Sequence, residues 1–590
     1  MSGIARALAR RVPLVGVLRT YHRRWLRADV IAGLTVAALI VPKNLGYAGI
    51  AGIPLQNGLY AAAAGAILYA IFGTSRQISV GPSSGLAAVA ASATVAAGIT
   101  NEDDVATFVA GITLASGVVF VLLAVLRMGW IAQFLSRAVV TGFLFGAALD
   151  VVIGELPKLT GTTVSGANPL VELWSWFGTL DDVDGATVIV GVVSLVVVFG
   201  LRIVAPQVPG ALVLVVGGLV ASRLLDLGKH GVALVGEVPR GLPSVDLPDG
   251  QVLWDHAGVV AVAAVALVLI GFSQTAGDAR AFAAKHQYQI DVDQESVAQA
   301  AANIGSGLVH GMPVSTSLSA SSLNDHSGAR TGIASITSGI TVLLTLLVLA
   351  PLFSDLPKPV LAALIIEAVV MGMMDVPELR RLKRVQRFDF WVAIVAIVAT
   401  VLVGVLAGVV VGVALSLLWL ISVATRPAIP ELARQSGTQV FRELESHPED
   451  KQVPGVVVLR MDGGLYFATA DALEDRIRGI VASAPELDGI VLDCGGIDFI
   501  DSQGSAKIGE VLRFAGEAGI VVRLARVKPA VSSVLKRDGV LDRLGAGRTH
   551  GNVYRAVAAQ LAERATPPAR RGAEVSDARG IADEAPGDPG

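Results

Sequence analysis

The chain has 590 residues, of which 53% are hydrophobic and 16% are charged. Soluble domains carry about 25% charged residues, so this composition excludes an ordinary soluble protein and predicts a polytopic membrane protein with one soluble part. The formal net charge of −3 argues against a nucleic-acid partner.

The single cysteine, Cys494, excludes a disulfide framework and a multi-cysteine metal site, and it favours a reducing compartment. Residues 1–28 are basic, but no small-residue cleavage site follows them. We therefore expect a cytoplasmic N-terminal segment and no removable signal peptide.

Residues 29–425 are built from apolar blocks, most of them long enough to cross the roughly 30 Å hydrocarbon layer of a bilayer. They predict an α-helical membrane domain of fourteen segments, of which the third and the tenth are too short to span alone. The segments lie at about 30–49, 52–73, 84–97, 106–127, 129–153, 186–203, 210–226, 257–277, 295–309, 317–325, 333–353, 358–375, 388–405 and 407–424.

Basic residues gather in the N-terminal segment and in the connections that follow even-numbered segments. Because Lys and Arg concentrate in cytoplasmic loops, we predict a multi-pass protein of the cytoplasmic membrane with both termini in the cytoplasm. The basic residues of these connections are Arg76, Arg127, Arg202, Arg280, Lys285, Arg330, Arg380, Arg381, Lys383, Arg384 and Arg387.

The two short segments share a proline followed by small and hydroxyl residues: "SVGPSSGLAAVAA" (79–91) and "GMPVSTSLSASS" (311–322). They stand seven segments apart, which predicts two halves of opposite topology, each with one broken helix. Two half-helix N-termini that meet inside the membrane would offer free N–H groups and positive dipole ends to an anion. The alternative is an ordinary re-entrant or surface loop.

Three stretches resemble the SulP family of inorganic-anion transporters, which includes plant sulfate transporters, cyanobacterial bicarbonate transporters and prestin. They are "DVIAGLTVAALIVPKNLGYAGIAGIPLQNGLYAA" (29–62), "GTSRQISVGPSSG" (73–85) and "NIGSGLVHGMPVSTSLSASSLNDHSGART" (303–331). The resemblance runs from about residue 15 to 555. It implies a seven-plus-seven inverted repeat, a mobile core domain, a gate domain and a homodimer.

Residues 436–558 resemble the cytoplasmic STAS domain of that family, an α/β unit. The stretch "LDCGGIDFIDSQG" (492–504) matches the loop in which soluble relatives carry a phosphorylated serine just before the glycine. Here that position is Gln503. Ser502, one place earlier, is either a regulatory hydroxyl or a cap of the following helix. Residues 566–590, rich in Pro, Gly, Ala, Arg and Asp, are predicted to be a disordered tail.

The resemblance places the substrate site on segments one, three, eight and ten. Lys43 takes the position of a family glutamine or glutamate, and Tyr47 that of an aromatic residue. A lysine inside a span is costly and by default functional. Alternatively, Lys43 snorkels to the interface and Tyr47 only packs. Lys43 is the only Lys or Arg deep in these four segments.

On the broken helices, Ser317 and Ser319 are expected to donate to anion oxygens or to cap the half-helix. The equivalent residues of segment three are Ser83, Ser84 and Gly85. Many relatives carry an arginine where this chain has Ala320. We expect Lys43 to supply the missing cation from across the site.

In segment eight, Gln274 stands where relatives place a carboxylate that handles sodium or a proton, so this chain departs from the family pattern. Asp278 lies one helical turn later, on the same face. It pairs with Lys43, carries a coupling proton, or is a surface acid. His310 is either structural or a proton relay. No spacing predicts a metal site or a phosphate loop, so no cofactor is expected.

The sequence therefore predicts secondary active transport of a small inorganic anion by alternating access, with sulfate first, and no enzymatic activity. The expected partners are the anion, membrane lipid, a second copy of the chain and a coupling proton. The alternatives are a bicarbonate transporter, a chloride or dicarboxylate exchanger, a nucleobase permease, and a membrane sensor that signals through the STAS domain. Measurable flux separates a transporter from a sensor.

Overall fold

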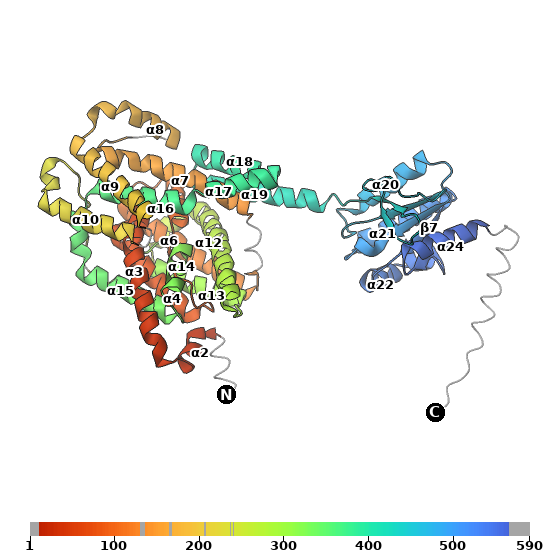
Figure 1. The fold of residues 1–590 in the computed structure, drawn as a ribbon, viewed down its shortest axis with the longest axis horizontal. Coiled ribbons are helices and arrows are strands. Elements are labelled where there is room, and N and C mark those ends of the chain that lie inside the picture. The colour runs from red at the N-terminus through yellow and green to blue at the C-terminus, as the bar shows by residue number, and fades with distance from the viewer. Residues whose placement is uncertain are drawn as a thin grey trace. The chain divides into compact units, whose positions relative to one another are not determined.

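The computed structural model describes residues 11–129, 136–164, 168–205, 208–236, 238–239 and 241–565. They divide into two compact units, of which the first ends at Leu417 and the second begins at Leu418 (Figure 1). The tail predicted at 566–590 lies outside the described residues.

The first unit is helical, and each of the fourteen predicted segments contains a helix. These helices are α3 (Arg23–Ala51), α4 (Leu55–Phe72), α5 (Ser84–Ala97), α6 (Glu102–Val125), α7 (Arg137–Thr160), α9 (Gly185–Val204), α10 (Gly210–Leu224), α12 (Ala257–His286), α13 (Val292–Leu308), α14 (Leu318–His326), α15 (Ile333–Val348), α16 (Lys358–Met373), α18 (Arg387–Val403) and α19 (Val405–Ala424). Shorter helices connect them: α2 (Pro13–Arg19), α8 (Pro169–Gly178), η2 (Leu180–Asp182), η3 (Leu227–His230), α11 (Gly250–Asp255), η4 (Ala350–Asp355) and α17 (Val376–Val385).

The fifth segment differs from its predicted bounds of 129–153, because α7 begins at Arg137 and ends at Thr160. Ser136 caps the helix by accepting a hydrogen bond from the backbone N–H of Val139, and Gly161 ends it with a φ of 75°. Residues 130–135, which made the apolar run start earlier, lie outside the described residues.

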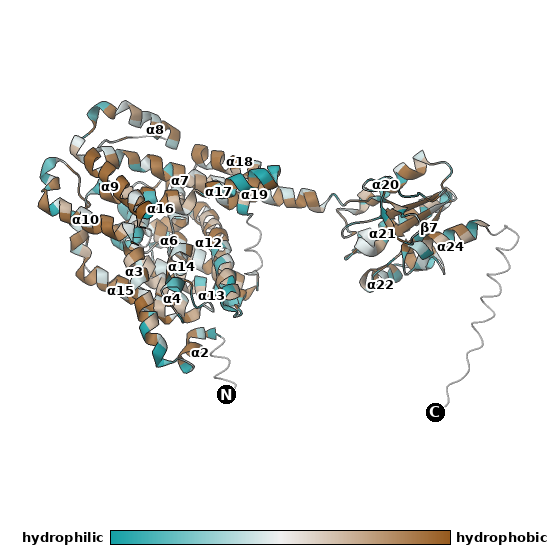
Figure 2. Cartoon of the chain, viewed as in Figure 1, coloured by the Kyte–Doolittle hydropathy of each residue, from teal (hydrophilic) through white to brown (hydrophobic). Residues whose placement is uncertain are grey.

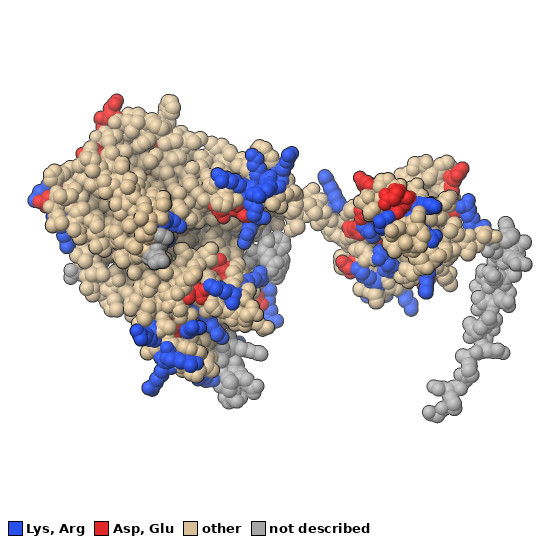
Figure 3. Space-filling view, in the orientation of Figure 1, with Lys and Arg blue, Asp and Glu red and all other residues tan. Residues whose placement is uncertain are grey.

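Among the described residues, eight helices are long and apolar enough to cross a membrane, while α5, α10 and α15 are shorter apolar helices. Figure 2 shows apolar residues dominating α9, α10 and α18. Most of the surface of this unit seen in Figure 3 carries no charged residue. Large apolar side chains are exposed there, as expected for contact with lipid; they include Ile189, Val196, Leu224 and Trp391.

The two short segments meet, as the sequence predicts. Strands β1 (Val80–Pro82) and β2 (Val314–Thr316) lead into α5 and α14, and they pair antiparallel with Gly81 opposite Ser315. Because the pairing is antiparallel, α5 and α14 begin at opposite ends of this short ladder, and residues from both helix starts line a common cavity.

Glycines allow close packing around α3, the helix that carries Lys43. A Cβ atom at Gly33 would lie 2.4 Å from the carbonyl oxygen of Ala334 in α15. A Cβ atom at Gly58, in α4, would lie 2.3 Å from the carbonyl oxygen of Asn44. Only glycine permits such approach between helix backbones, so α3 is held tightly from two sides.

Two fully buried carboxylates fix the connections next to the half-helices. Glu295 accepts hydrogen bonds from the backbone N–H groups of Thr74 at 2.8 Å and Ser75 at 3.3 Å, just before β1. Asp29 accepts from the backbone N–H groups of Arg330 at 2.7 Å and Thr331 at 3.1 Å, just after α14. Each carboxylate thus ties one end of a broken-helix segment to a neighbouring helix.

The second unit is a six-stranded sheet in the order β4-β3-β5-β6-β7-β8, with β5 to β8 parallel and β3 and β4 antiparallel. Side chains alternate along β6, so Ile490 and Leu492 join one apolar core and Val491 the other. The elements are β3 (Glu431–Arg434), β4 (Phe441–Glu443), β5 (Val456–Arg460), α20 (Ala470–Ser483), β6 (Gly489–Asp493), η5 (Cys494–Gly496), α21 (Ser502–Glu517), β7 (Val521–Ala525), α22 (Pro529–Arg537), α23 (Val540–Leu544), β8 (Thr549–His550) and α24 (Val553–Ala565).

Candidate functional site: a polar space at the half-helix ends

Each half-helix begins with a serine cap. Ser83 accepts a hydrogen bond from the backbone N–H of Leu86 at 3.4 Å, and Ser317 accepts one from Ala320 at 3.4 Å. Each capping oxygen thus accepts from one backbone N–H group at the start of its half-helix. Two positive dipole ends therefore converge where β1 and β2 meet.

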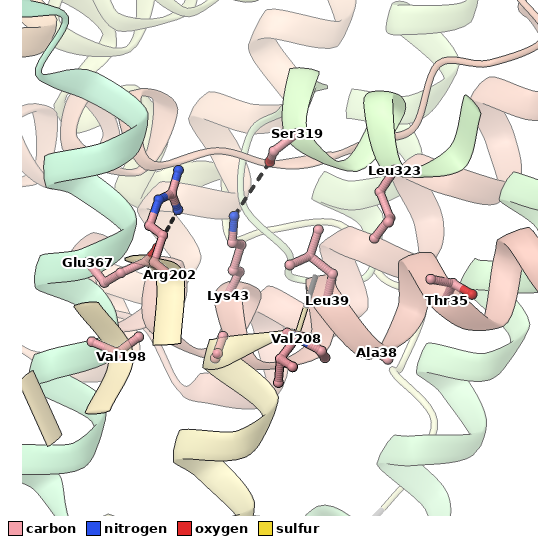
Figure 4. Close-up of a pocket in the computed structure, with 13 residues that line it drawn as sticks. Thr35, Ala38, Leu39, Lys43, Val198, Arg202, Val208, Ser319, Leu323 and Glu367 are labelled. Atoms are coloured by element: carbon pink, nitrogen blue, oxygen red, sulfur yellow. Dashed lines mark hydrogen bonds and ion pairs between the residues drawn. The ribbon is translucent and has the colours of Figure 1, made fainter. Parts of the chain in front are cut away.

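Lys43 reaches the start of α14. Its Nζ atom lies 3.5 Å from the Oγ atom of Ser319, and Ser319 Oγ lies 3.3 Å from Ser317 Oγ (Figure 4). The lysine therefore extends toward a half-helix end and brings an ammonium group to two hydroxyls. This contact favours the functional interpretation of Lys43 over snorkelling.

Three spaces surround this contact, and Ser319 lines all of them. A first cavity of about 460 Å³ is lined by Lys43 and Ser319 together with residues of α9 and α16. A second cavity of about 530 Å³ lies at the other side of Ser319 and reaches α12. A narrow space of about 10 Å³ is lined by Lys43, Tyr47 and Ser319 as well.

All ten residues that the sequence assigned to the site line one or more of these spaces. Lys43, Ser319 and Ala320 line the first cavity or the narrow space, and the second cavity is lined by Tyr47, Ser83, Ser84, Gly85, Gln274, Asp278, Ser317 and Ser319. The structure brings together residues from four segments that lie between residues 43 and 320 of the chain.

The residues of segment eight lie apart from Lys43. The Oε1 atom of Gln274 accepts a hydrogen bond from the hydroxyl of Ser315 in β2 at 3.2 Å. Asp278 faces the second cavity, which Lys43 does not line. This position argues against a pair of Asp278 with Lys43, while the roles of proton carrier and surface acid stay predictions.

Ala320 is 1% exposed and borders only the narrow space. An arginine at this position would have little room without movement of its neighbours. Tyr47 also belongs to the main apolar core while it lines the second cavity, so packing and site lining are both satisfied by its position.

Sequence reasoning limited the site to segments one, three, eight and ten, and it missed Arg202 and Glu367. Arg202 lies in the last turn of α9, and its Nη1 atom is 2.8 Å from the Oε1 atom of Glu367 in α16. Both line the first cavity with Lys43. The available signal was Glu367, the only carboxylate among the mainly apolar residues 358–374.

His310 lines none of these three spaces. It occupies a turn with a φ of 53° and its ring is hydrogen-bonded to the carboxylate of Asp246. This hydrogen bond lowers the pKa of Asp246 below its usual range. The position favours the structural role of His310 over a proton relay. Within the described residues, no group of three or more His, Cys, Asp or Glu side chains is placed to hold a metal ion.

The interpretation of Ser502 as a helix cap is wrong. Helix α21 begins at Ser502, and its cap is Asp501, whose carboxylate accepts a hydrogen bond from the backbone N–H of Gly504 at 2.7 Å. Ser502 is exposed at the start of the helix, where a regulatory role stays a prediction.

Two broken helices that meet around a polar space are an arrangement found at the binding sites of many transporters. The Sulfate permease family model matches residues 26–396, and the STAS domain model matches residues 447–559. The chain thus belongs to the sulfate permease family and carries a C-terminal STAS domain, and the predicted family resemblance is confirmed.

Named relatives extend over almost the whole chain. A probable sulfate transporter of Mycobacterium tuberculosis (strain H37Rv) is 33% identical over 536 residues, which is 90% of this chain and 95% of the relative. The chloroplastic sulfate transporter 4.1 of Arabidopsis thaliana is 28% identical over 550 residues, or 90% and 79% of the two chains.

Solved structures share the fold at lower identity. The murine Solute Carrier 26 family member A9 anion transporter, in its inward-facing state, matches with a TM-score of 0.85 and 21% identity over 95% of each chain. The transmembrane domain of the cyanobacterial bicarbonate transporter BicA matches with a TM-score of 0.58 and 22% identity, over 66% of this chain and 98% of BicA. These likenesses establish the helical membrane fold alone.

Proposed function

We propose that the protein is a secondary transporter that binds a small inorganic anion near the N-terminal ends of α5 and α14. Sulfate is the leading candidate for this anion. The observation that carries this proposal is the contact of Lys43 with Ser319 at the start of α14, where residues from both half-helix starts line a common cavity. The names of the Mycobacterium and Arabidopsis relatives support sulfate as the first anion to test.

The charges at this point are suited to a divalent anion. Lys43 supplies one positive charge, and each helix N-terminus contributes about half a charge. The sum is about two positive charges, and the mainly apolar lining of the first cavity strengthens their interaction with an anion. The hydroxyls of Ser317 and Ser319 add hydrogen-bond donors for oxyanion oxygens.

Alternating access completes the proposal. The antiparallel pairing of β1 with β2 supports the inverted repeat of two seven-segment halves. In this proposal the protein is a homodimer in the cytoplasmic membrane, and both termini lie in the cytoplasm. A proton is the coupling ion. Asp278, facing the second cavity, is the carboxylate that would carry that proton.

Uptake into proteoliposomes tests this function. The full-length protein is reconstituted, and uptake of labelled sulfate and labelled bicarbonate is measured with and without a pH or sodium gradient. The expected result is saturable sulfate uptake that an inward proton gradient stimulates. Faster bicarbonate uptake would instead favour a bicarbonate transporter, and the absence of any flux would favour the sensor.

A further inference from the structure

The first cavity contains a second cation that the proposed site does not use. Arg202 enters it from α9 and Lys43 from α3, so two helices that are distant in the sequence each bring a positive charge. Figure 4 shows both side chains extending toward the half-helix that carries Ser319. The rest of the lining is mainly apolar, which strengthens the field of both charges.

Glu367 holds Arg202 in this position. The Glu367 side chain is 8% exposed, while that of Arg202 is 48% exposed, so the carboxylate is buried and the guanidinium reaches into open space. Among the described residues, Arg202 donates one hydrogen bond from its Nη1 atom to the Oε1 atom of Glu367. A guanidinium has five N–H donors in a planar fork, so donors remain for an oxyanion.

The formal charges of these residues add to +1, because Glu367 cancels one of the two cations. A structural ion pair would be expected to sit within the packing of α9 and α16, away from the polar residues of α3 and α14. Here the pair instead faces the cavity in which Lys43 meets Ser319. The carboxylate therefore orients the guanidinium and leaves the cavity with the net charge of a single cation.

We infer that Arg202 is a second binding residue for the transported oxyanion, which it receives together with Lys43 in the first cavity, and that Glu367 is its positioning residue. This inference rests on the proposed function. Arg202 would favour a tetrahedral oxyanion over chloride, because its fork can donate two parallel hydrogen bonds to two oxygens of one anion.

A charge-neutral pair of substitutions separates direct contact from the overall field. The double variant Arg202→Gln with Glu367→Gln removes one positive and one negative charge, so the cavity keeps its net charge of +1. It also leaves no buried carboxylate unpaired, which limits damage to the fold. The Arg202→Lys variant keeps the ion pair and replaces the planar fork by a single ammonium group.

Arg223 offers a matched control. It lies in the last turn of α10, its side chain is 56% exposed, and its Nη2 atom is 2.8 Å from a carboxylate oxygen of Asp355. This pair lines none of the three spaces. The control variant is Arg223→Gln with Asp355→Asn.

The experiment measures binding of labelled sulfate to the purified full-length protein, and chloride affinity from its competition with that label. We expect the Arg202/Glu367 double variant to bind sulfate at least about tenfold more weakly while chloride affinity changes less than about threefold. Arg202→Lys should fall between the parent and the double variant. The Arg223/Asp355 variant should bind both anions as the parent does.

Sulfate binding by the double variant that equals the parent's would overturn the role of Arg202 and leave the proposed function standing. An equal loss in the Arg223/Asp355 variant would also overturn it, because the effect would then come from the fold. If the parent binds neither anion, the proposed function fails and the inference fails with it.

Discussion

Lys43 places a charged group next to two serine hydroxyls at the start of a half-helix. The Nζ to Oγ distance of 3.5 Å to Ser319 is long for a hydrogen bond, so the ammonium is not tightly held by the protein. A bound oxyanion could therefore accept from the ammonium and from the hydroxyls at once. At the scale of single residues, the proposed chemistry depends on the positive charge of the Lys43 side chain.

Replacing Lys43 by Gln should weaken sulfate binding by about 2 kcal/mol, which is roughly 30-fold, because a charge-assisted hydrogen bond to the anion is lost. Equilibrium binding of labelled sulfate to the purified full-length variant measures the loss. Lys229→Gln is the control, since Lys229 pairs with Asp226 on the surface and lines none of the three spaces. Parent-like affinity in Lys43→Gln would place the anion elsewhere.

Helix α3 depends on close contact with α4 to hold Lys43 in position. The two backbones approach each other at Gly58 in α4. Any side chain at that position would meet the carbonyl oxygen of Asn44, which follows Lys43 in α3. The site therefore requires the packing of whole elements as well as the residues that line it.

Gly58→Ala should lower the free energy of unfolding by about 2 kcal/mol and also weaken sulfate binding, because a methyl group must push α3 away. Gly217→Ala is the matched control. A Cβ atom at Gly217 meets nothing within 4 Å, so alanine there should be neutral or slightly stabilising. Thermal unfolding of both purified variants measures the change in stability, and sulfate titration measures the change in affinity. Equal stability of the two would show that the helices yield without cost.

Hydropathy and turn chemistry were sufficient to predict the fourteen segments of the membrane unit. Apolar length predicts the segments, and a proline followed by hydroxyl residues predicts the two half-helices. The start of α7 at Arg137 was missed, because the apolar run continues upstream of the Ser136 cap. Ser502 was one candidate for the cap of α21, because serine and aspartate cap equally well, but the structure has the neighbouring Asp501 in that role.

The pairing of Arg202 with Glu367 could not be predicted from the sequence, for a different reason. The two residues belong to segments six and twelve, and only the packing of α9 against α16 brings them together. Periodicity within one segment carries no information about which partner another segment provides. The lone Glu367 indicated that a partner exists, but it did not identify that partner.

The whole molecule consists of two units with separate apolar cores. The membrane unit has its cores among its own helices, and the STAS unit has one on each face of its sheet. Each unit therefore has apolar cores of its own, which is the property expected of a domain.

Truncation after residue 430 should leave the membrane unit assembled while reducing flux or surface yield. The reason is that no described residue of the STAS unit belongs to the membrane cores, whereas the unit is part of the proposed transporter. Size-exclusion chromatography tests assembly, and sulfate uptake per reconstituted molecule tests flux. Full yield and full uptake would show that the STAS unit is dispensable.

Topology can be read from a single engineered thiol. Gln386→Cys, at the exposed end of α17, should react with a membrane-impermeant reagent only from the cytoplasmic side. The native Cys494 is fully buried, and burial raises the pKa of its thiol to about 12, so it should contribute no background. Labelling of intact cells from outside would reverse the proposed orientation.

The central claim is that sulfate occupies the space beside Lys43, and the most direct test is protection of a thiol placed there. Leu39 lines the first cavity and the narrow space without offering a polar group, so Leu39→Cys reports on occupancy. The rate of its modification by an anionic thiol reagent is measured in the full-length protein with increasing sulfate, and Gln386→Cys serves as the control. We predict that sulfate slows modification of Leu39→Cys in a saturable manner and leaves Gln386→Cys unchanged. A rate at Leu39→Cys that does not depend on sulfate, in protein that binds labelled sulfate, would contradict the account.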